Sequence, residues 1–351
     1  MSPKVSVVMA SYNHAEFVRE SIESVLHQSF TDFELVITDD GSSDGTVDVV
    51  RSVADPRIDF VALAENQGAC DALNSSIRRS QGQYVAVLNS DDFFLPGKLG
   101  HQVDYLDTHL NIGAVFGQPK VVDETGRELA DTSHPFATVF SKRNRSRAEW
   151  LRYFFEIGNG LCHPTLMIRR SCYDKAGLYD PILRNLPDLD MWFRVCQCFD
   201  IHVMSEQLTA FRVLKNERNT SAPSAPNMAR IAWETPYVLG HLARLPEAEL
   251  RDIIEPWPEA KAGRAAHAAL ALAALRVDKP GYRPFALALL RDLIVRDREA
   301  FSLEEYFRLV GENDPNGMKY ATAPVRSFHL KGFSLAHGLL DEAEAWWRRR
   351  L

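Results

Sequence analysis

The sequence has no run of apolar residues near the roughly 18 needed to cross a membrane as a helix. Its first residues lack the apolar core and the small-residue cleavage site of a signal peptide. Basic residues do not exceed acidic ones, since the net charge is −7, whereas a general nucleic-acid binder normally carries a basic face. We therefore expect a cytoplasmic protein that binds no nucleic acid.

Cysteine is sparse as well, with five residues in a chain of 351. An odd count in a long chain without a secretion signal favours reduced thiols over a disulfide framework. Cys196 and Cys198 lack the two-residue spacer of a zinc knuckle, and no second pair follows them. The glycines form neither G-x-G-x-x-G nor G-x-x-x-x-G-K, which argues against a dehydrogenase-type dinucleotide fold and against a P-loop.

Short apolar runs alternate with amphipathic segments through the first 90 residues. Strands are expected at residues 5–10, 34–38, 58–63 and 84–88, with helices between them at about 18–28, 47–53 and 70–79. Asn13 followed by Glu16 predicts an N-cap and a capping box for the first helix. This alternation is typical of a doubly wound, mostly parallel α/β sheet.

Two pairs of adjacent acids follow predicted strands. Asp39 and Asp40 end the second strand, and Asp91 and Asp92 follow the fourth. Because the carboxyl ends of parallel strands border one crevice, the two pairs can converge on one ligand. Adjacent carboxylates repel each other, and a hard cation such as Mg²⁺ or Mn²⁺ relieves the repulsion while it binds substrate phosphate. The alternative, an acid pair that caps the next helix or faces water, stays open at this point.

The pattern is looser beyond Pro96. Strands are expected at residues 112–116, 120–123, 165–168 and 208–213. Residues 131–149 are polar and basic; we interpret them as a solvated loop, with contact to an anionic acceptor or a diphosphate as the alternative. His163 follows a tight glycine-containing segment and is either a core residue or part of a site.

Asp188 fits the N-cap of a helix whose apolar face carries Met191, Trp192 and Val195. Its role is either that of a cap alone or that of a carboxylate aimed into the crevice and available as a general base. Both alternatives are compatible with the local sequence.

The composition shifts to alanine, leucine and arginine after the polar stretch 216–227, which we interpret as a linker. Helices are expected at 260–277, 284–299 and 334–350, and Ser302 with Glu305 predicts a capping box. We therefore divide the chain into an α/β domain, residues 1–221, and an all-α domain, residues 222–351, with five to seven helices.

The role of the helical domain is open, and a homodimer through it is one alternative. Trp346 and Trp347 stand beside Arg348, Arg349 and Arg350, a combination suited to peripheral contact with the anionic inner face of a membrane. A solvated terminus is the interpretation that we favour.

Six stretches, in this order and spacing, resemble the family-2 glycosyltransferases of the GT-A fold over residues 4–221. They are VSVVMASYNH, VITDDGSSDGT, ENQGACDALNSSI, GQYVAVLNSDD, CHPTLMIRR and PDLDMWFRV. The resemblance implies a nucleotide-diphosphate-sugar donor, with UDP as the family-level expectation, and a divalent metal, Mn²⁺ or Mg²⁺. It also implies inverting transfer to a hydroxyl of a glycan, lipid-linked or protein acceptor, as in polysaccharide biosynthesis.

The resemblance further implies roles on the donor side. Ala10 and Tyr12 would line the uracil site, with Tyr12 stacking on the base. Asp40 would hydrogen-bond the base or the ribose, and Asp91 would meet the ribose or the metal shell. Asp92 matches the acid that ligates the metal under the diphosphate.

Asp188 matches the catalytic base of the family, and His163 falls in the acceptor-side segment. The chain departs from the family pattern at Asn89, where many relatives have Asp, and at Pro187, where the base motif usually has Glu. It departs again at Leu214, where a histidine able to bind metal often stands. These departures indicate that the diphosphate, more than the protein, holds the metal.

Two other functions compete with transfer. A non-catalytic sugar-nucleotide-binding protein, whose helical domain recruits a partner, has no need of Asp188. A nucleotidyltransferase would want a glycine-rich, basic phosphate loop near the first strand, which residues 11–14 do not supply.

Overall fold

The computed structural model describes residues 2–129, 135–214, 224–296 and 301–312. The chain divides into two compact units, Met1–Ala300 and Phe301–Leu351. In the second unit the described element is α14, Leu303–Glu312. The Glu305 amide donates to Ser302 Oγ at 3.1 Å, as the predicted capping box requires.

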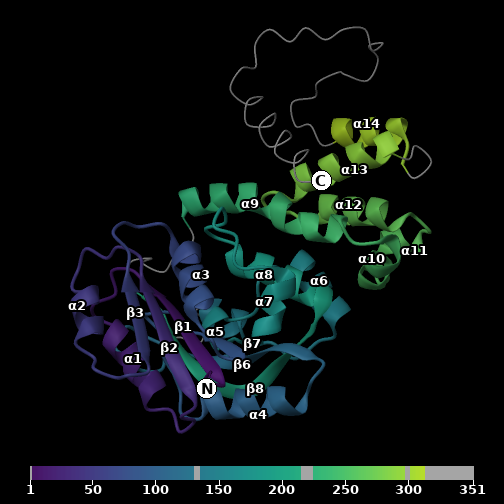
Figure 1. The fold of residues 1–351 in the computed structure, drawn as a ribbon. Coiled ribbons are helices and arrows are strands. Elements are labelled where there is room, and N and C mark those ends of the chain that lie inside the picture. Colours follow the sequence, from purple (N-terminus) through teal and green to yellow (C-terminus); the bar gives the residue numbers. More distant parts are fainter. Residues whose placement is uncertain (1, 130–134, 215–223, 297–300, 313–351) are drawn as a thin grey trace. The chain divides into compact units, whose positions relative to one another are not determined.

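An eight-stranded sheet, counted over the described residues, lies at the centre of the first unit in the order β3-β2-β1-β4-β7-β6-β8-β5 (Figure 1). The strands are β1 Val5–Ser11, β2 Phe33–Asp39, β3 Ile58–Ala62, β4 Tyr84–Val87, β5 Phe93–Phe94, β6 Ile112–Val122, β7 Met167–Arg169 and β8 Asp200–Arg212. Neighbours among β1 to β4 pair in parallel, as do β6 and β8, whereas β7 is antiparallel to β4 and β6. The predicted doubly wound, mostly parallel sheet is confirmed.

Helices cover both faces of this sheet. They are α1 Val18–Leu26, α2 Thr46–Arg51, α3 Ala69–Arg79, α4 Lys98–Thr108, α5 Pro135–Val139, α6 Arg147–Glu156, α7 Arg170–Ala176 and α8 Pro187–Cys198, with a 3₁₀ turn, η1, at His163–Thr165. Alternate strand residues enter opposite cores: Val8 and Val85 pack with α3, α6 and α8, whereas Val7 and Ala86 pack with α1 and α4. Burial on both faces explains why these strands are apolar runs rather than alternating sequences.

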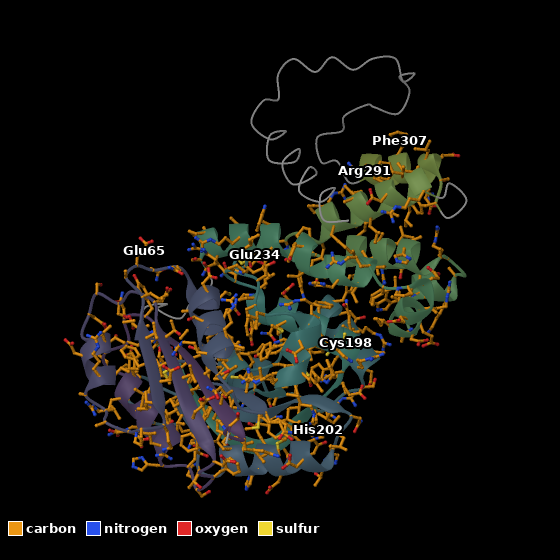
Figure 2. All side chains as sticks on the ribbon, viewed as in Figure 1. Glu65, Cys198, His202, Glu234, Arg291 and Phe307 are labelled. Carbon is orange, nitrogen blue, oxygen red and sulfur yellow. The ribbon has the colours of Figure 1, made fainter. Side chains whose placement is uncertain are left out.

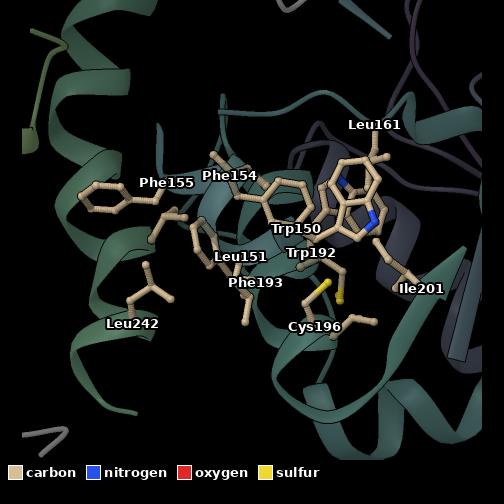
Figure 3. Close-up of a cluster of buried hydrophobic side chains, with 14 of the residues drawn as sticks. Trp150, Leu151, Phe154, Phe155, Leu161, Trp192, Phe193, Cys196, Ile201 and Leu242 are labelled. Atoms are coloured by element: carbon tan, nitrogen blue, oxygen red, sulfur yellow. The ribbon is translucent and has the colours of Figure 1, made fainter. Parts of the chain in front are cut away.

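Five more described helices complete the first unit: α9 Ala225–Ala243, α10 Glu247–Ile254, α11 Pro258–Lys261, α12 Ala266–Arg276 and α13 Tyr282–Arg296. They share one hydrophobic cluster with α6 and α8 (Figure 3). Phe155 of α6 lies 4.8 Å, between ring centroids, from Trp257 and 5.5 Å from Tyr282. The helical region thus packs on the α/β region through a common core. The proposed boundary at residue 221 lies outside the described residues and stays a prediction.

The predicted cap of the first helix does not form, because the residue expected to cap it bonds a neighbouring loop instead. The capping box at Asn13 and Glu16 is wrong, because α1 begins at Val18 and its N-cap, Phe17, makes no side-chain capping bond. Asn13 instead adopts a φ of 52°, and its Oδ1 accepts a hydrogen bond from the Ser43 amide at 2.9 Å. The loops after β1 and β2 lie side by side, and that contact decides the conformation.

Several expected boundaries shift as well. The strands expected at 112–116 and 120–123 form one strand, β6, because its pairing with β8 continues across irregularities near Gln118. The linker 216–227 ends early, since Ser224 caps α9 by accepting from the Asn227 amide at 3.3 Å. The helix expected at 260–277 is interrupted between α11 and α12, where Gly263 has a φ of 77°. In the polar stretch 131–149, Ser146 and Glu149 form a capping box that starts α6.

The helix expected at 334–350 and the Trp-Arg terminus lie outside the described residues. Among the helices that the structure describes, none combines the length and the apolar character needed to cross a bilayer.

Candidate active site

The residues expected on the donor side lie at the carboxyl ends of neighbouring parallel strands. Strand β1 lies between β2 and β4, and Ser11 at its end is in register with Asp39. Hydrogen bonds tie the loops that follow these strands: His14 Nδ1 pairs with Ser90 Oγ at 2.8 Å, and the Asn13 amide donates to Ser42 Oγ at 2.8 Å. The three loops therefore meet at one edge of the sheet.

Tyr12 and Ala10 lie on the first of these loops and on the strand before it. Tyr12 exposes 45% of its surface, and Ala10 is partly buried in β1. An exposed aromatic ring beside strand ends is able to stack on a planar base. The geometry of both residues is compatible with the role that the resemblance implies.

Asp39 and Asp40 are almost completely buried and hold the surrounding backbone. Asp39 accepts from Ser42 N at 2.8 Å, whereas Asp40 accepts from Gln67 N at 2.7 Å and from Gly68 N at 2.9 Å. Asp40 thus fixes the turn before α3. Each of its oxygens keeps a second lone pair for a ligand.

Asp92 joins the end of β4 to β8. Its Oδ1 accepts from the Arg212 amide at 2.7 Å, and its Oδ2 accepts from Asn89 Nδ2 at 2.8 Å. Burial, and then the charge of Asp91, raise the pKa of Asp92 well above its usual value. The Arg212 side chain is itself buried and donates from Nε to the Asp91 carbonyl at 2.7 Å. The Asp92 carboxylate and the Asp91 backbone are thereby held in one network, and the closeness of the two acids favours a compensating positive charge.

The donor set at this position fits a hard divalent cation only in part. In the ranges that the structure describes, no group of three or more His, Cys, Asp and Glu side chains is arranged to hold a metal. Asp91 and Asp92 provide carboxylate oxygens, and Mg²⁺ commonly takes one or two of these together with substrate phosphates. The residues present therefore fit a cation that brings most of its ligands with a diphosphate.

Asp188 lies in the first turn of α8. The N-cap prediction is wrong by two positions, because the N-cap is Leu186 and Pro187 occupies the first helical position, where its missing N–H costs nothing. Asp188 Oδ1 accepts from the Leu189 amide at 2.7 Å, and Oδ2 accepts from Asn159 Nδ2 at 2.5 Å.

Burial raises the pKa of Asp188 to about 6, and the charge of Glu234 acts in the same direction. The hydrogen bonds from Leu189 and Asn159 oppose this rise. The residue remains partly exposed despite its dense surroundings. A partly accessible carboxyl with a pKa near the working pH has the properties of a general base.

The segment 158–166 contacts Asp188 and the strands β4 and β8, which Asp92 joins. Asn159 donates to Asp188, the Pro164 carbonyl accepts from Thr209 Oγ1 of β8 at 3.2 Å, and the Leu166 carbonyl accepts from the Val87 amide of β4 at 3.2 Å. After burial itself, the charges of Asp92 and Asp188 both raise the pKa of the Cys162 thiol. Asp92 and Asp188 thus lie close to the same buried segment and not on unconnected surfaces.

His163 of this segment is packed rather than free. Its Nε2 pairs with the Tyr179 hydroxyl at 2.9 Å, and its ring lies 5.9 Å from that of Trp192. Burial lowers the pKa of His163 to about 4, so the ring is neutral at neutral pH. The acceptor-side role of His163 stays a prediction.

Sequence reasoning missed Asn159, Arg212 and Glu234 as partners of the acids. Asn159 stands between Gly158 and Gly160, which signals a tight turn but not what the turn contacts. Arg212 is the last residue of β8, and a lone basic residue at a strand end suggests an exposed position. Glu234 lies on a helix outside the stretch that resembles the family. The signal there is its spacing from Tyr237 and His241, which places the three residues on one face of a helix.

Comparison with known proteins agrees with the fold. The family described as Glycosyl transferase family 2 matches residues 6–175. An uncharacterized glycosyltransferase of Rickettsia typhi is 30% identical over 251 residues, which cover 71% of this chain and 74% of the relative. An uncharacterized glycosyltransferase of Methanocaldococcus jannaschii is 29% identical over 216 residues, covering 60% of this chain and 71% of that protein.

Among solved structures, S. aureus TarS 1-349 in complex with UDP-GlcNAc superposes with a TM-score of 0.58 at 19% identity. The match covers 88% of this chain and 84% of that one. At this identity the likeness shows the fold alone.

Proposed function

The chain belongs to glycosyltransferase family 2 and is a glycosyltransferase of the GT-A fold, and from this premise we propose that it transfers a sugar from a UDP-sugar, with inversion, to an acceptor hydroxyl. The acceptor is a glycan, a lipid-linked sugar or a protein. One observation carries the mechanism. Asp188, whose carboxyl has a pKa of about 6, and Asp92 both lie close to the segment 158–166. Family membership favours an enzyme over the non-catalytic sugar-nucleotide-binding alternative.

The donor side of the proposal rests on the strand-end loops. Tyr12 offers an exposed ring for the base, and Asp40 and Asp91 offer acceptors for base or ribose hydrogens. The UDP-GlcNAc complex of the TarS fragment supports UDP as the nucleotide.

Asp188 supplies the proton chemistry. At pH 7 a carboxyl with a pKa of about 6 is mostly ionised, so it can accept the proton of the acceptor hydroxyl. The hydroxyl oxygen forms a bond to the anomeric carbon from the face opposite the diphosphate. The bond from that carbon to the diphosphate oxygen breaks, and the diphosphate leaves with the electron pair.

Asp91 and Asp92 would hold Mn²⁺ or Mg²⁺ together with the diphosphate, and the cation when bound would offset the negative charge of the leaving group. Arg212 and Asn89 keep Asp92 in place for this role through the hydrogen bonds described above.

The test compares Asp188→Asn with Asp48→Asn. Asp48 also lies in the first turn of a helix, α2, but is exposed. We first identify a donor by its effect on the melting temperature, using UDP-GlcNAc, UDP-glucose, UDP-galactose and GDP-mannose with Mn²⁺. Release of the nucleotide diphosphate from that donor is then followed with and without Mn²⁺.

We expect Asp188→Asn to lose on the order of 100-fold or more in turnover while it still binds the donor, because general-base catalysis contributes about 10²–10⁴-fold. Asp48→Asn should match the wild type. Full turnover by Asp188→Asn would show that the assigned base is wrong. Donor binding by a wild type that never releases the nucleotide would instead favour the non-catalytic alternative.

A further inference from the structure

Glu234 is a buried carboxylate on α9, only 1% exposed, and is labelled in Figure 2. It accepts hydrogen bonds from three consecutive backbone amides that immediately precede α8. Oε1 accepts from Arg184 N at 2.8 Å, and Oε2 accepts from Asn185 N at 3.0 Å and from Leu186 N at 2.8 Å. A side chain about 50 residues away in the sequence thus satisfies the amides at this helix start.

Glu234 holds the backbone just before α8 and does not cap the helix, since its three amide partners precede Pro187. Leu186 is the N-cap of α8 and makes no side-chain capping bond, and Pro187 has no N–H to donate. Asp188 follows Pro187, so Glu234 holds the backbone immediately before the residue that carries the carboxylate. Asn159 holds the carboxylate itself.

Two more side chains of α9 contact the same region. The Tyr237 hydroxyl donates to Asp180 Oδ2 at 2.5 Å, and His241 Nε2 pairs with Asp190 Oδ1 at 2.6 Å. Positions 234, 237 and 241 follow the i, i+3, i+7 spacing of one helical face. This face of α9 therefore contacts the loop before α8 through Asp180 and contacts α8 itself through Asp190. These two residues lie before and after Asp188 in the sequence.

Glu234 also acts on Asp188 through its charge, which raises the pKa of that carboxyl. Cys70, Cys162 and Tyr179 are also coupled electrostatically to Asp188. Burial raises the pKa values of all three, so they are neutral at neutral pH. Glu234 is thus a charged neighbour whose removal changes the electrostatic surroundings of the base.

We propose that Glu234 is a positioning residue for Asp188, so that one side chain of α9, a helix beyond the segment matched by the family, places the base for turnover. This inference rests on the proposed function, since it needs Asp188 to be the base. It assigns the helical region a role in turnover and not only in packing.

The experiment compares Glu234→Gln and Glu234→Asp with Tyr237→Phe. The glutamine keeps the size but removes the charge and turns an NH₂ donor toward backbone amides, whereas the aspartate keeps the charge with a shorter reach. Tyr237→Phe removes a part-buried contact of the same helix face, to Asp180, and leaves residues 184–186 held. Nucleotide release from the donor identified above is measured from pH 5 to 9, together with KM and the melting temperature.

For Glu234→Gln we expect kcat to fall about 10-fold or more with little change in KM, because a small misplacement of a reacting group is costly. The acid limb of the pH profile should move to lower pH, since a negative charge beside Asp188 is lost. Glu234→Asp should lower kcat without moving the limb. Tyr237→Phe should change neither.

A merely structural role predicts a different pattern: Glu234→Gln and Tyr237→Phe would lose melting temperature and kcat in parallel, with the limb unmoved. Wild-type kcat in Glu234→Asp would likewise overturn the inference, and this variant decides the matter if Glu234→Gln does not fold. Full turnover by Asp188→Asn would show that Asp188 is not the base, the part of the proposed function that this inference presupposes. An inactive Asp188→Asn beside a fully active Glu234→Gln would refute this inference alone.

Discussion

The hydrogen bond from Asn159 to Asp188 allows the assignment of the base to be tested without removing the base. Asn159 Nδ2 donates to Asp188 Oδ2 at 2.5 Å and lowers the pKa of a carboxyl that burial otherwise raises to about 6. Asn159→Ala removes this donor, so the pKa of Asp188 should rise further. The ionised, active form should then require a higher pH.

The size of the effect follows from the strength of such a bond. A hydrogen bond to a charged group contributes about 1.5–3 kcal/mol, and one pKa unit corresponds to about 1.4 kcal/mol. Because Asp188 is partly exposed, we take the lower end and expect a shift of about one unit. Turnover should then fall about five-fold at pH 6, about two-fold at pH 7 and hardly at all at pH 8.5.

Asn159→Asp provides a graded comparison. It keeps an oxygen able to accept from the Leu161 amide, as Asn159 Oδ1 does at 3.0 Å, but places a second carboxylate against Asp188. The acid limb of kcat/KM should therefore move to higher pH in the order wild type, Asn159→Ala, Asn159→Asp. Asn185→Ala is the matched control, because the side-chain oxygen of Asn185 accepts no hydrogen bond.

The assay is nucleotide release from the identified donor between pH 5 and 9, with donor affinity measured in parallel. An acid limb that stays in place in both variants would refute the reasoning. An equal loss of turnover at every pH would also refute it, since that result means that Asn159 shapes the segment and does not affect the ionisation of Asp188.

Two further predictions concern Asp92 and a buried lysine. Asp92→Asn should lower the melting temperature of the free protein, because Asp92 accepts from Arg212 and Asn89, and should also remove the Mn²⁺-dependent part of the donor-induced rise in melting temperature. An unchanged melting temperature of the free variant in thermal-shift assays would contradict this. Burial lowers the pKa of Lys98 to about 7, so the folded state binds fewer protons than the unfolded state above pH 7 and stability should rise with pH. In urea denaturation, the free energy of unfolding of the wild type relative to Lys98→Met should increase by about 2 kcal/mol from pH 7 to pH 9, and a constant difference would disprove the effect.

Much of the α/β region was predictable because its signals are local. The runs that became β1 and β4 are apolar on both faces, and parallel strands buried on two sides need such sequences. Asp39, Asp40, Asp91 and Asp92 end or follow strands, so topology alone placed them at one edge of the sheet. A local pattern failed where a residue bonds a partner distant in the sequence. Asn13 does not cap the first helix, because its side chain bonds Ser43.

The sequence by itself determined the order of strands and helices, the family and the positions of the acids, because apolar periodicity and ordered motifs act over a few residues. Only the tertiary structure decided what each acid contacts and how it ionises. Asp188 owes its raised pKa to burial and to Glu234, while Asn159 opposes the rise. Glu234 lies 46 positions after Asp188 in the chain, and Asn159 lies 29 positions before it. No local pattern encodes such partners, since desolvation and charge depend on distances that are set when the chain packs.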